Sequence, residues 1–501
     1  MKYTLVQSER KNGLFHGSFN LLNLINLLIL LAILLLSFSC QVFADDPNTI
    51  NFTQAVQLAY SFSPKLMSSS ASVDAARANT IKARGNALPK LDLDENAARS
   101  NNPLNVFSYH LEQRQVTFNN FGFAQFSGAG SLNTAPTELN EPGYASNYDT
   151  GLMLNIPLYA GGRNIDLINK ANSLLESAQQ GNIIAQENLI YQLLESYEGF
   201  HATAQLEVAA NQSLIAATTF LNIARSLYKQ GVVIQSDVLL AQTNQRAAEA
   251  TLADVIAQNE NQLDTFRVLL GKPDSEFIPG ANVNIYLPSQ SINDLEKLAL
   301  IHNPQILAYR ANKDASREDM NAARAQNLPK INLVLEHDWY ADTPTLSAPS
   351  NTAMLEMNWP LFSSGMQYGE YKQAAAEFSQ SAANLDDTEN NIRLAVDEAY
   401  RLAQTAEIQA RYNDTNSIQA EEAMRLLVLR YQQGIIPITQ LLQGQAQLDN
   451  VRAERVSAHY NVLMARAKLY MLINQLSPAI CHYVNEGNSS ISPYQNKDDL
   501  V

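Results

Sequence analysis

Two stretches of the sequence share one pattern: "SLYKQGVVIQSDVLLAQ" at Ser226–Gln242 and "VLRYQQGIIPITQLLQGQ" at Val428–Gln445. In both, a tyrosine, a polar pair, a glycine, an apolar run and a leucine-rich segment follow one another. The separation is constant at 203 positions, as from Gly231 to Gly434. The same turn at one fixed spacing indicates an internal repeat.

Two further pairs of segments support the repeat. "NALPKLDL" at Asn86–Leu93 returns as "QNLPKINL" at Gln326–Leu333, a shift of 240 positions. "LNIPLYAGG" at Leu154–Gly162 returns as "MNWPLFSSG" at Met357–Gly365, again with the shift of 203. The difference between the two shifts, 37 residues, means that the first copy carries an insertion between its two matched segments.

The repeat divides the chain into two copies, 45–285 and 286–476, followed by a tail at 477–501 that we expect to be disordered. The insertion lies within 100–147, a segment rich in Asn, Gly, Ser and Phe. Gly and Asn favour turns and irregular structure, so the composition predicts a long loop there.

The amino terminus has the order of an export signal. Three basic residues precede an apolar run over 21–38, and a small-residue pattern ends at Ala44. This predicts a secretory signal peptide over 1–44. A permanent membrane anchor and lipidation at Cys40 remain open as alternatives. Cleavage after Ala44 would leave Cys481 as the one cysteine, which excludes an internal disulfide or a cysteine metal site.

Composition and motifs exclude several functions. Lys+Arg number 34 against 49 Asp+Glu, a net charge of -15, which argues against a nucleic-acid partner. The chain has no phosphate loop, no His-Glu-x-x-His and no nucleophile motif. Glu336-His337-Asp338 lies in a predicted strand without a partner at metal-ligand spacing. We therefore expect no enzyme activity, no cofactor and no metal.

Each copy contains two strand patterns, in which apolar and polar residues alternate with the two-residue period of a half-buried strand. A stretch of about 10 such residues is long enough to cross a bilayer as a tilted strand. The predicted strands are about 89–99 and 149–158 in the first copy, and about 329–339 and 352–361 in the second.

The remaining segments predict long helices, over 162–271 and 365–475. Each of these two ranges would contain two helices. The first would run for about 65 residues, roughly 100 Å, and a shorter return helix would follow it. Gly231 and Gly434 follow the end of the long helix, where a residue that tolerates positive φ closes a helix and reverses the chain. The repeated stretch is thus predicted to be the far tip of a helical hairpin.

Strand, Pro-Leu-aromatic-x-x-Gly, long helix, Tyr-x-x-Gly turn and leucine-rich return helix, in this order and twice, resemble the TolC family of outer-membrane efflux and secretion channels. The resemblance implies a mainly α fold with a membrane β-barrel portion, in which a long coiled-coil helical tunnel continues the barrel. Four strands cannot close a transmembrane barrel, so copies must share one. A homotrimer gives the family's 12-stranded barrel, although two or four copies would also close.

The resemblance also implies a function. It implies a passive exit duct in the bacterial outer membrane, in contact with its lipid, with a long periplasmic portion. The duct would serve a tripartite efflux pump or a type I secretion system. Its periplasmic tip would dock on a periplasmic adaptor (membrane fusion) protein and an inner-membrane pump or ABC transporter, which open it.

Residues carried over from the family fall into two groups. The residues expected at the periplasmic tip, where partners dock and the gate lies, are Tyr228, Gly231, Asp237, Leu239, Tyr431, Gly434, Gln440 and Gln443. The residues expected at the barrel-tunnel junction are Pro157, Gly162, Pro360 and Gly365. The family often places acids in the second return helix, where this chain has Gln440 and Gln443. Asp237 is the acid of the first copy, so a complete carboxylate ring is in doubt.

A different class of function remains open. An envelope-anchored trimeric coiled-coil scaffold or adhesin, without transport activity, would explain the helices and the export signal. It does not explain strands with an apolar face of membrane length at the start of each helical stretch. A trimer in outer-membrane fractions would favour the channel, and a monomer or dimer released by mild salt would favour the scaffold.

Overall fold

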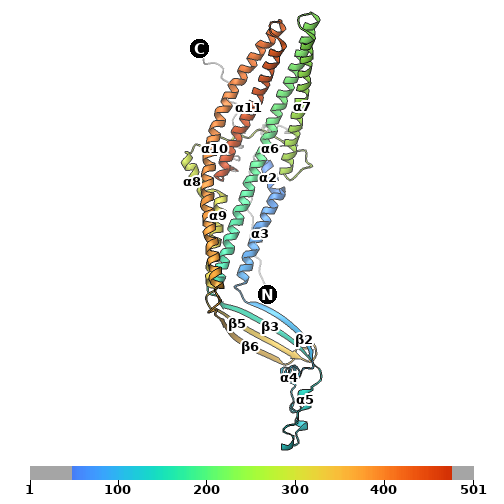
Figure 1. Ribbon diagram of the computed structural model, residues 1–501, viewed down its shortest axis with the longest axis vertical. Coiled ribbons are helices and arrows are strands. Elements are labelled where there is room, and N and C mark those ends of the chain that lie inside the picture. Colours follow the sequence, from blue (N-terminus) through green and yellow to red (C-terminus); the bar gives the residue numbers. More distant parts are fainter. Residues whose placement is uncertain (1–47, 477–501) are drawn as a thin grey trace, which may run out of the picture.

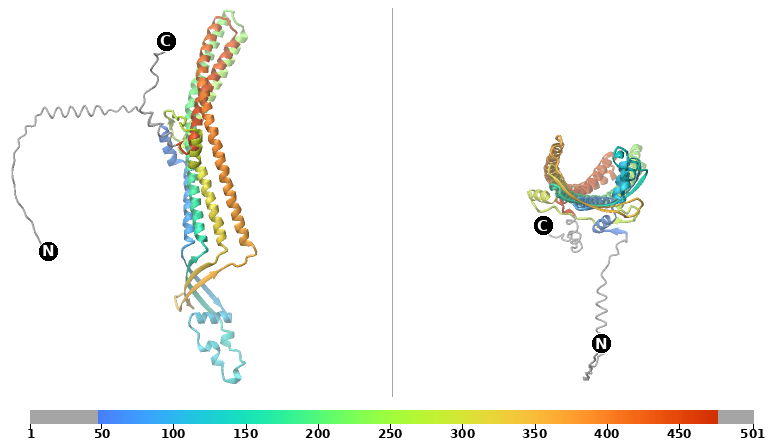
Figure 2. Two further views of the ribbon diagram at one scale, coloured as in Figure 1. Left: turned by 90° about the vertical axis from the view of Figure 1, so that its left-hand side faces the viewer. Right: turned by 90° about the horizontal axis from the view of Figure 1, so that it is seen from below.

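The computed structural model describes residues 48–476, so the expected signal peptide and the C-terminal tail lie outside the described residues. The molecule is elongated, with a β-sheet near one end and two helical hairpins at the other (Figure 1). Seen along its length, the chain forms an open arc with a concave inner side (Figure 2). Among residues 48–476, no helix has both the length and the apolar character needed to cross a membrane.

Both copies build the same set of helices. The long helices, of 67 residues, are α6 (Arg163–Lys229) and α10 (Met366–Gln432). At 1.5 Å per residue each measures roughly 100 Å. The return helices, of 35 residues, are α7 (Gln235–Leu269) and α11 (Ile438–Leu472). Shorter helices of 22 residues, α3 (Pro64–Gly85) and α9 (Pro304–Ala325), precede the strands.

Each long helix packs beside two shorter ones. Helices α3 and α7 both lie along α6, and α9 and α11 both lie along α10. Contacts of α6 with α9 and with α11 join the two copies. The helical part is therefore a curved layer with α3 and α7 at one edge and α10 at the other.

The four long strands form one antiparallel sheet in the order β2-β3-β5-β6. Their bounds are β2 (Lys90–Ser100), β3 (Ala145–Tyr159), β5 (Lys330–Ala341) and β6 (Pro349–Asn358). Strand β6 ends before Pro360 and not at 361 as the alternation predicts. Proline lacks the N–H that a ladder requires, so the pairing stops ahead of it.

The middle of the molecule contains elements that the sequence patterns do not reveal. Strands β1 (Thr49–Ile50) and β4 (Ile278–Pro279) pair in parallel and bring the start of the first copy beside its end. Helix α2 (Phe52–Phe62) packs against α6, and α8 (Ile292–His302) packs against α10. The hydroxyl of Tyr197, which is fully buried, donates to the carbonyl oxygen of Ala281 at 2.9 Å. The largest core cluster therefore surrounds this fastening point.

The segment expected to be a long loop has structure of its own. It contains α4 (Pro103–Glu112), three short 3-10 turns and α5 (Thr137–Asn140). The side chain of Asn102 caps α4 by accepting from the N–H of Leu104 at 3.0 Å. The insertion is thus a folded unit that extends past the sheet, on the side away from the helices (Figure 1).

Two glycines allow a matched test of the fold. Gly161, before α6, has φ +64°, and a Cβ there would lie 2.8 Å from the carbonyl oxygen of Ala325. Gly181 lies inside α6, where a Cβ would meet open space. We expect Gly161→Ala to lower the stability by about 1–2 kcal/mol or more, because the left-handed conformation and the close contact both oppose a side chain.

The control Gly181→Ala should raise the stability by up to about 1 kcal/mol, because alanine favours a helix interior. Thermal unfolding midpoints of the two variants in detergent, each compared with the unmodified protein, give the comparison. Equal effects of the same sign would contradict this view of the junction.

Candidate functional site

The candidate site is the pair of turns at the helical tip, at the top of Figure 1. In the first turn, the N–H of Gly231 donates to the carbonyl oxygen of Tyr228 at 3.0 Å, and that of Val232 to Leu227 at 2.9 Å. In the second, Gly434 donates to Tyr431 at 2.9 Å and Ile435 to Arg430 at 3.0 Å. This bond pair defines the Schellman motif, which requires the left-handed conformation seen at Gly231 (φ 75°) and Gly434 (φ 70°).

The two turns share one core. A Cβ at Gly434 would lie 3.1 Å from a methyl group of Val232, so the turns touch. We call the buried side chains beneath them the tip cluster: Phe220, Leu221, Ala224, Leu227, Ala241, Met424, Tyr431, Ile438, Leu441 and Leu448. Because this cluster takes residues from all four hairpin helices, the hairpins cannot separate at the tip without exposing apolar surface.

Tyr431 and Asp237 approach each other across the two hairpins. Tyr431 is 1% exposed, and its hydroxyl has no hydrogen-bond partner within residues 48–476. Burial raises the pKa of Tyr431, and the negative charge of Asp237 raises it further. Asp237 lies in the first turn of α7, where a carboxylate is stabilised by the free N–H groups of the helix. The first turn of α7 thus lies close enough to Tyr431 for the charge of Asp237 to act on the tyrosine.

The other residues expected at the tip lie on its surface. Tyr228 and Leu239 are 47% and 55% exposed, and Gln440 and Gln443 are also exposed. Gln440 is the repeat mate of Asp237, so the second copy presents an uncharged amide where the first presents a carboxylate. Within one chain, the structure joins Gly231 to Tyr228 and Gly434 to Tyr431 by hydrogen bonds, and it places Tyr431 within reach of the charge of Asp237. The roles of all these residues in docking and gating stay predictions.

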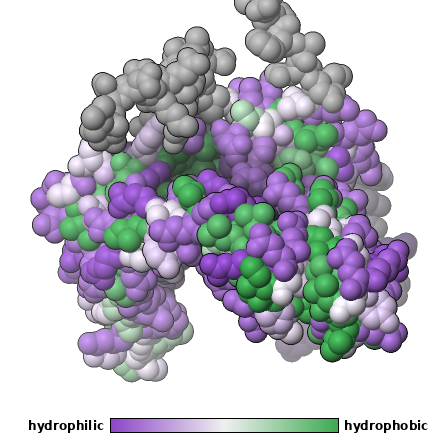
Figure 3. Space-filling model, turned by 90° about the horizontal axis from the view of Figure 1, so that it is seen from above, coloured by the Kyte–Doolittle hydropathy of each residue, from purple (hydrophilic) through white to green (hydrophobic). Residues whose placement is uncertain are grey.

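The end of the tip exposes apolar side chains. Val232, Ile234 and Ile435 are 54%, 67% and 65% exposed. Seen from this end, green apolar residues interrupt the purple polar surface (Figure 3). Contiguous apolar patches on a surface indicate interaction sites.

A second feature near the tip is a groove between the hairpins, with a volume of about 430 Å³. We call it the hairpin groove. Its walls come from α6, α7 and α11 and consist mainly of small residues: Leu206, Ala209, Ala210, Ser213, Asn244, Ala247, Ala248, Thr251, Val255, Ala446, Asp449 and Ala453. Sequence reasoning missed it. The sequence feature that could have revealed it is the recurrence of alanine in both return helices, because short side chains leave a depression where the helices face each other.

The sheet has two chemically different faces. The register places Leu91, Leu154 and Leu335 side by side in one row, and Asp92, Met153 and Glu336 in the next. Side chains of successive rows point to opposite faces. The apolar face carries Leu91, Leu93, Leu152, Leu154, Ile156, Leu333, Leu335, Leu355 and Met357, and the polar face carries Lys90, Asp92, Asp94, Asn96, Asp149, Asn155, Glu336 and Asp338.

The edges and the apolar face of this sheet are open. Within residues 48–476, β2 and β6 have a neighbouring strand on one side only. Leu93 and Leu355, on the apolar face, are 69% and 67% exposed. A single chain therefore presents unpaired backbone groups and a broad apolar surface to its surroundings.

The residues expected at the junction lie where this sheet meets the long helices. Gly162 and Gly365 precede α6 and α10 directly, both with φ 86°. Pro157 lies inside β3, where the register shifts between Pro157 and Tyr159, and Pro360 follows β6. Their functional role stays a prediction.

The Glu336-His337-Asp338 cluster does not converge. Strand alternation puts His337 on the face opposite to Glu336 and Asp338, and its Nδ1 lies 2.6 Å from the side-chain oxygen of Asn351. Among residues 48–476, no group of three or more His, Cys, Asp or Glu could hold a metal ion.

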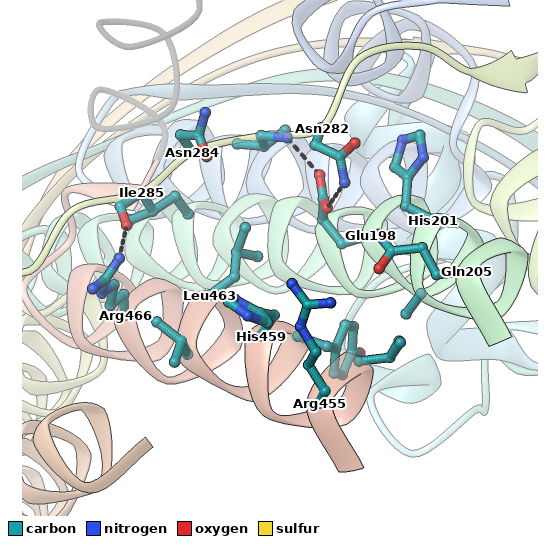
Figure 4. A pocket seen from close by; sticks show the side chains of 15 residues that line it. Glu198, His201, Gln205, Asn282, Asn284, Ile285, Arg455, His459, Leu463 and Arg466 are labelled. Atoms are coloured by element: carbon teal, nitrogen blue, oxygen red, sulfur yellow. Dashed lines mark hydrogen bonds between the residues drawn. The ribbon is translucent and has the colours of Figure 1, made fainter. Parts of the chain in front are cut away.

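A cavity of about 470 Å³ lies at the middle of the molecule, between α6, α11 and the segment 282–285 that leads to the second copy (Figure 4). The carboxylate of Glu198 accepts from the N–H of Val283 at 2.6 Å and from the side chain of Asn282 at 3.2 Å. Arg466 donates to the carbonyl oxygen of Ile285 at 2.9 Å. These bonds fasten the connecting segment to the helices. Sequence reasoning missed them, since the partners lie 84 and more positions apart.

Two buried carboxyl groups of α6 make the stability of the protein depend on pH. Burial raises the pKa of Glu198 to about 7, against the opposing effect of the hydrogen bonds from Val283 and Asn282. Burial also raises the pKa of Glu187 to about 7. A folded-state pKa above the ordinary value of 4.5 means that the folded protein binds more protons between these two values. The contribution of these two groups to the stability of the folded protein is therefore greatest below pH 4.5, and it is lost as the pH rises through 7.

We expect Glu187→Gln to remove part of this dependence. Its Oε2 atom is buried without a hydrogen-bond partner among the described residues, so the charged form has nothing to compensate it. The variant should unfold at a higher temperature than the unmodified protein at pH 8, and at the same temperature at pH 4. The exposed residue of the same helix, Glu176, supplies the control Glu176→Gln, which should change neither value. If the difference in unfolding temperature between pH 4 and pH 8 is the same in Glu187→Gln as in the unmodified protein, Glu187 is not a source of the pH dependence.

Comparisons with known proteins agree with this geometry. A family model described as "Outer membrane efflux protein" matches residues 55–272 and 295–475. Proteases secretion protein PrtF of Dickeya chrysanthemi is 25% identical over 272 residues, which cover 49% of this chain and 57% of that protein. Outer membrane protein TolC of Escherichia coli (strain K12) is 23% identical over 472 residues, covering 89% and 86%.

Solved structures with the same fold include outer-membrane channels. The channel OprN aligns with a TM-score of 0.71 at 18% identity, over 85% of this chain and 90% of that one. The outer membrane protein VceC of Vibrio cholerae aligns with a TM-score of 0.69 at 18% identity, over 85% and 96%. The fold described above is therefore that of these channels.

Proposed function

Because the chain belongs to the outer membrane efflux protein family, we propose that three copies form a passive exit duct through the bacterial outer membrane. The strands close one barrel, four from each copy, and the helices continue it as a tunnel in the periplasm. The duct serves a tripartite efflux pump or a type I secretion system. The observation that carries the proposal is the sheet, which has two unpaired edges, one apolar face and one polar face.

The unpaired edges require more than one copy. In hydrocarbon, a free N–H or C=O group costs several kcal/mol, so spanning sheets must close on themselves. Four strands cannot do so, because about eight is the smallest number seen in transmembrane barrels. We propose three copies, as in the TolC family, with β6 of one copy beside β2 of the next. Outer-membrane lipid then covers the apolar face and the polar face lines the duct.

The tip is proposed as the gate. The tip cluster holds the two hairpins of a chain together, and the charge of Asp237 in one hairpin acts on the buried Tyr431 in the other. Opening would slide the hairpins past one another between two packings of the same helices. Only the junction within a chain has this carboxylate, because Gln440 replaces it in the second copy. We therefore propose that the Asp237–Tyr431 pair biases the closed packing.

Docking of an adaptor is proposed at the hairpin groove and the apolar end of the tip. A groove between two helices, lined by small residues, fits a third helix that lays its apolar side chains into it. The periplasmic adaptor (membrane fusion) protein and the inner-membrane pump or ABC transporter are the proposed partners. The names of the relatives include protease secretion and cobalt-zinc-cadmium resistance, so the relatives differ in what they export. We therefore propose that the partner pump determines which substrate passes through the duct.

The proposal is tested by mass and conductance. The protein extracted in detergent should have the mass of three chains and should produce discrete, small single-channel steps in a planar bilayer. Small steps are expected because the closed tip restricts the path. A mass below three chains together with an absence of steps would contradict the duct and favour a coiled-coil scaffold.

A second experiment tests the gate. We expect Asp237→Asn to raise the fraction of time in the open state by about two- to fivefold, equivalent to the roughly 0.3–1 kcal/mol of a charge at a helix start. The exposed neighbour in the same turn supplies the control Ser236→Ala, which should leave the open fraction unchanged. Equal open fractions in all the variants would remove Asp237 from the gate.

A further inference from the structure

The insertion of the first copy is a compact unit with its own internal contacts. The side chains of Gln125 and Thr137 hydrogen-bond at 2.9 Å, and the N–H of Thr137 donates to Gln125 at 2.8 Å. A Cβ at Gly122 would lie only 2.3 Å from the ring of Pro136, so these two parts of the segment pack closely. The unit is therefore a preformed surface and not a flexible connection.

This surface is uncharged and aromatic. Residues 115–137, which we call the aromatic unit, contain no charged side chain. Phe118, Phe123, Phe126 and Leu132 are 78%, 60%, 57% and 72% exposed. A cavity of about 310 Å³ lies among Phe121, Phe123, Phe126, Leu132 and Pro136. Exposed apolar groups gathered on one surface indicate a surface that becomes covered.

The residues directly before the aromatic unit attach it to the polar side of the sheet. Asn147 belongs to the polar face, because Asp149 and Gly151 follow it at the two-residue period of β3. The side chain of Gln113 donates to Asn147 at 2.8 Å, and Asn147 donates to Glu112 at 3.3 Å. Gln113 and Asn147 are both buried. The end of α4 thus rests on the face that lines the duct.

A second attachment reaches the far edge of the sheet. The guanidinium of Arg114 donates to the carbonyl oxygen of Pro349, in β6. The segment leaves the sheet at β2 and reaches β6, so it crosses the ends of the strands from one edge to the other. It occupies the end remote from the helices (Figure 1). In the duct proposed above, this place is the outer mouth.

We propose that the aromatic units of the three copies pack against one another and close the outer mouth of the duct. The occupant of each apolar surface is a second copy of this chain. Phe118, the most exposed aromatic side chain of the unit, enters the cavity beside Leu132 of the neighbouring copy. This inference rests on the trimeric duct and adds a second barrier, at the end opposite to the tip.

The position of the unit favours a copy over lipid as its occupant. Lipid contacts the apolar face of the sheet, whereas the unit is anchored on the polar face. The absence of charge over 115–137 offers no attraction for charged lipid headgroups. Around a rotation axis the exposed Phe118 of one copy and the cavity of the next are complementary surfaces, as in a closed ring of identical subunits.

The packing is tested by cross-linking. In the full chain with Cys40→Ser and Cys481→Ser, the pair Phe118→Cys and Leu132→Cys is oxidised in the membrane. We expect disulfide-linked dimers and trimers on denaturing gels, because the two sites belong to different copies. The control pair Leu104→Cys and Leu132→Cys uses an equally exposed leucine on α4, and should remain monomeric.

Conductance provides a readout that does not depend on cysteine chemistry. Because the outer mouth and the closed tip restrict the same path in series, the double variant Phe118→Ser and Phe126→Ser should shift the single-channel steps to larger values. The conservative pair Phe118→Leu and Phe126→Leu should keep the original ones. A trimer with unchanged steps and no linked species would overturn the aromatic closure and leave the duct intact. A mass below three chains would overturn both.

Discussion

The constraint on which the rest of the structure depends is the pairing of backbone groups at the edges of a four-stranded sheet. In water, the open sides of β2 and β6 would be hydrated, but in a bilayer they must be paired. This requirement makes the single chain incomplete and demands that its edges match those of a copy. The proposed contact of that face with lipid would also explain the exposed apolar row that includes Leu93 and Leu355.

The helices follow from the same geometry. A sheet that closes around an axis must continue into a layer of helices that is curved in the same sense, as the arc in Figure 2 shows. Each copy achieves this by placing two shorter helices along one of 67 residues. The connection between copies is secured at the middle, where Tyr197 and Glu198, adjacent in α6, hold the backbone of Ala281 and Val283. On one side of this fastening the helices lead to the sheet, and on the other side the two hairpins lead to the tip.

Duplication alone would give a duct with equivalent junctions, and the chain departs from equivalence at both ends. At the tip, the charge of Asp237 acts on Tyr431 within the chain, while the repeat mate of Asp237 is the uncharged Gln440. At the sheet, only the first copy has the insertion with α4 and the aromatic unit. The repeated parts therefore form the architecture that the two copies share, and control of passage is proposed at the parts that differ between the copies.

The sequence by itself determined the repeat, the strand and helix types, the tip turns and the family. These features have local causes: a two-residue alternation, a long stretch without proline, and a glycine at a positive φ as in Gly231 and Gly434. Tertiary structure alone decided which residues meet across the chain: Val232 with Gly434, Glu198 with Val283, and Asn147 with Gln113. It also decided that the expected loop is folded, that β6 ends before Pro360, and that a groove of small residues lies between the hairpins. Such contacts join positions far apart in the sequence, and their free energy comes from burial and from hydrogen bonds that no local pattern encodes.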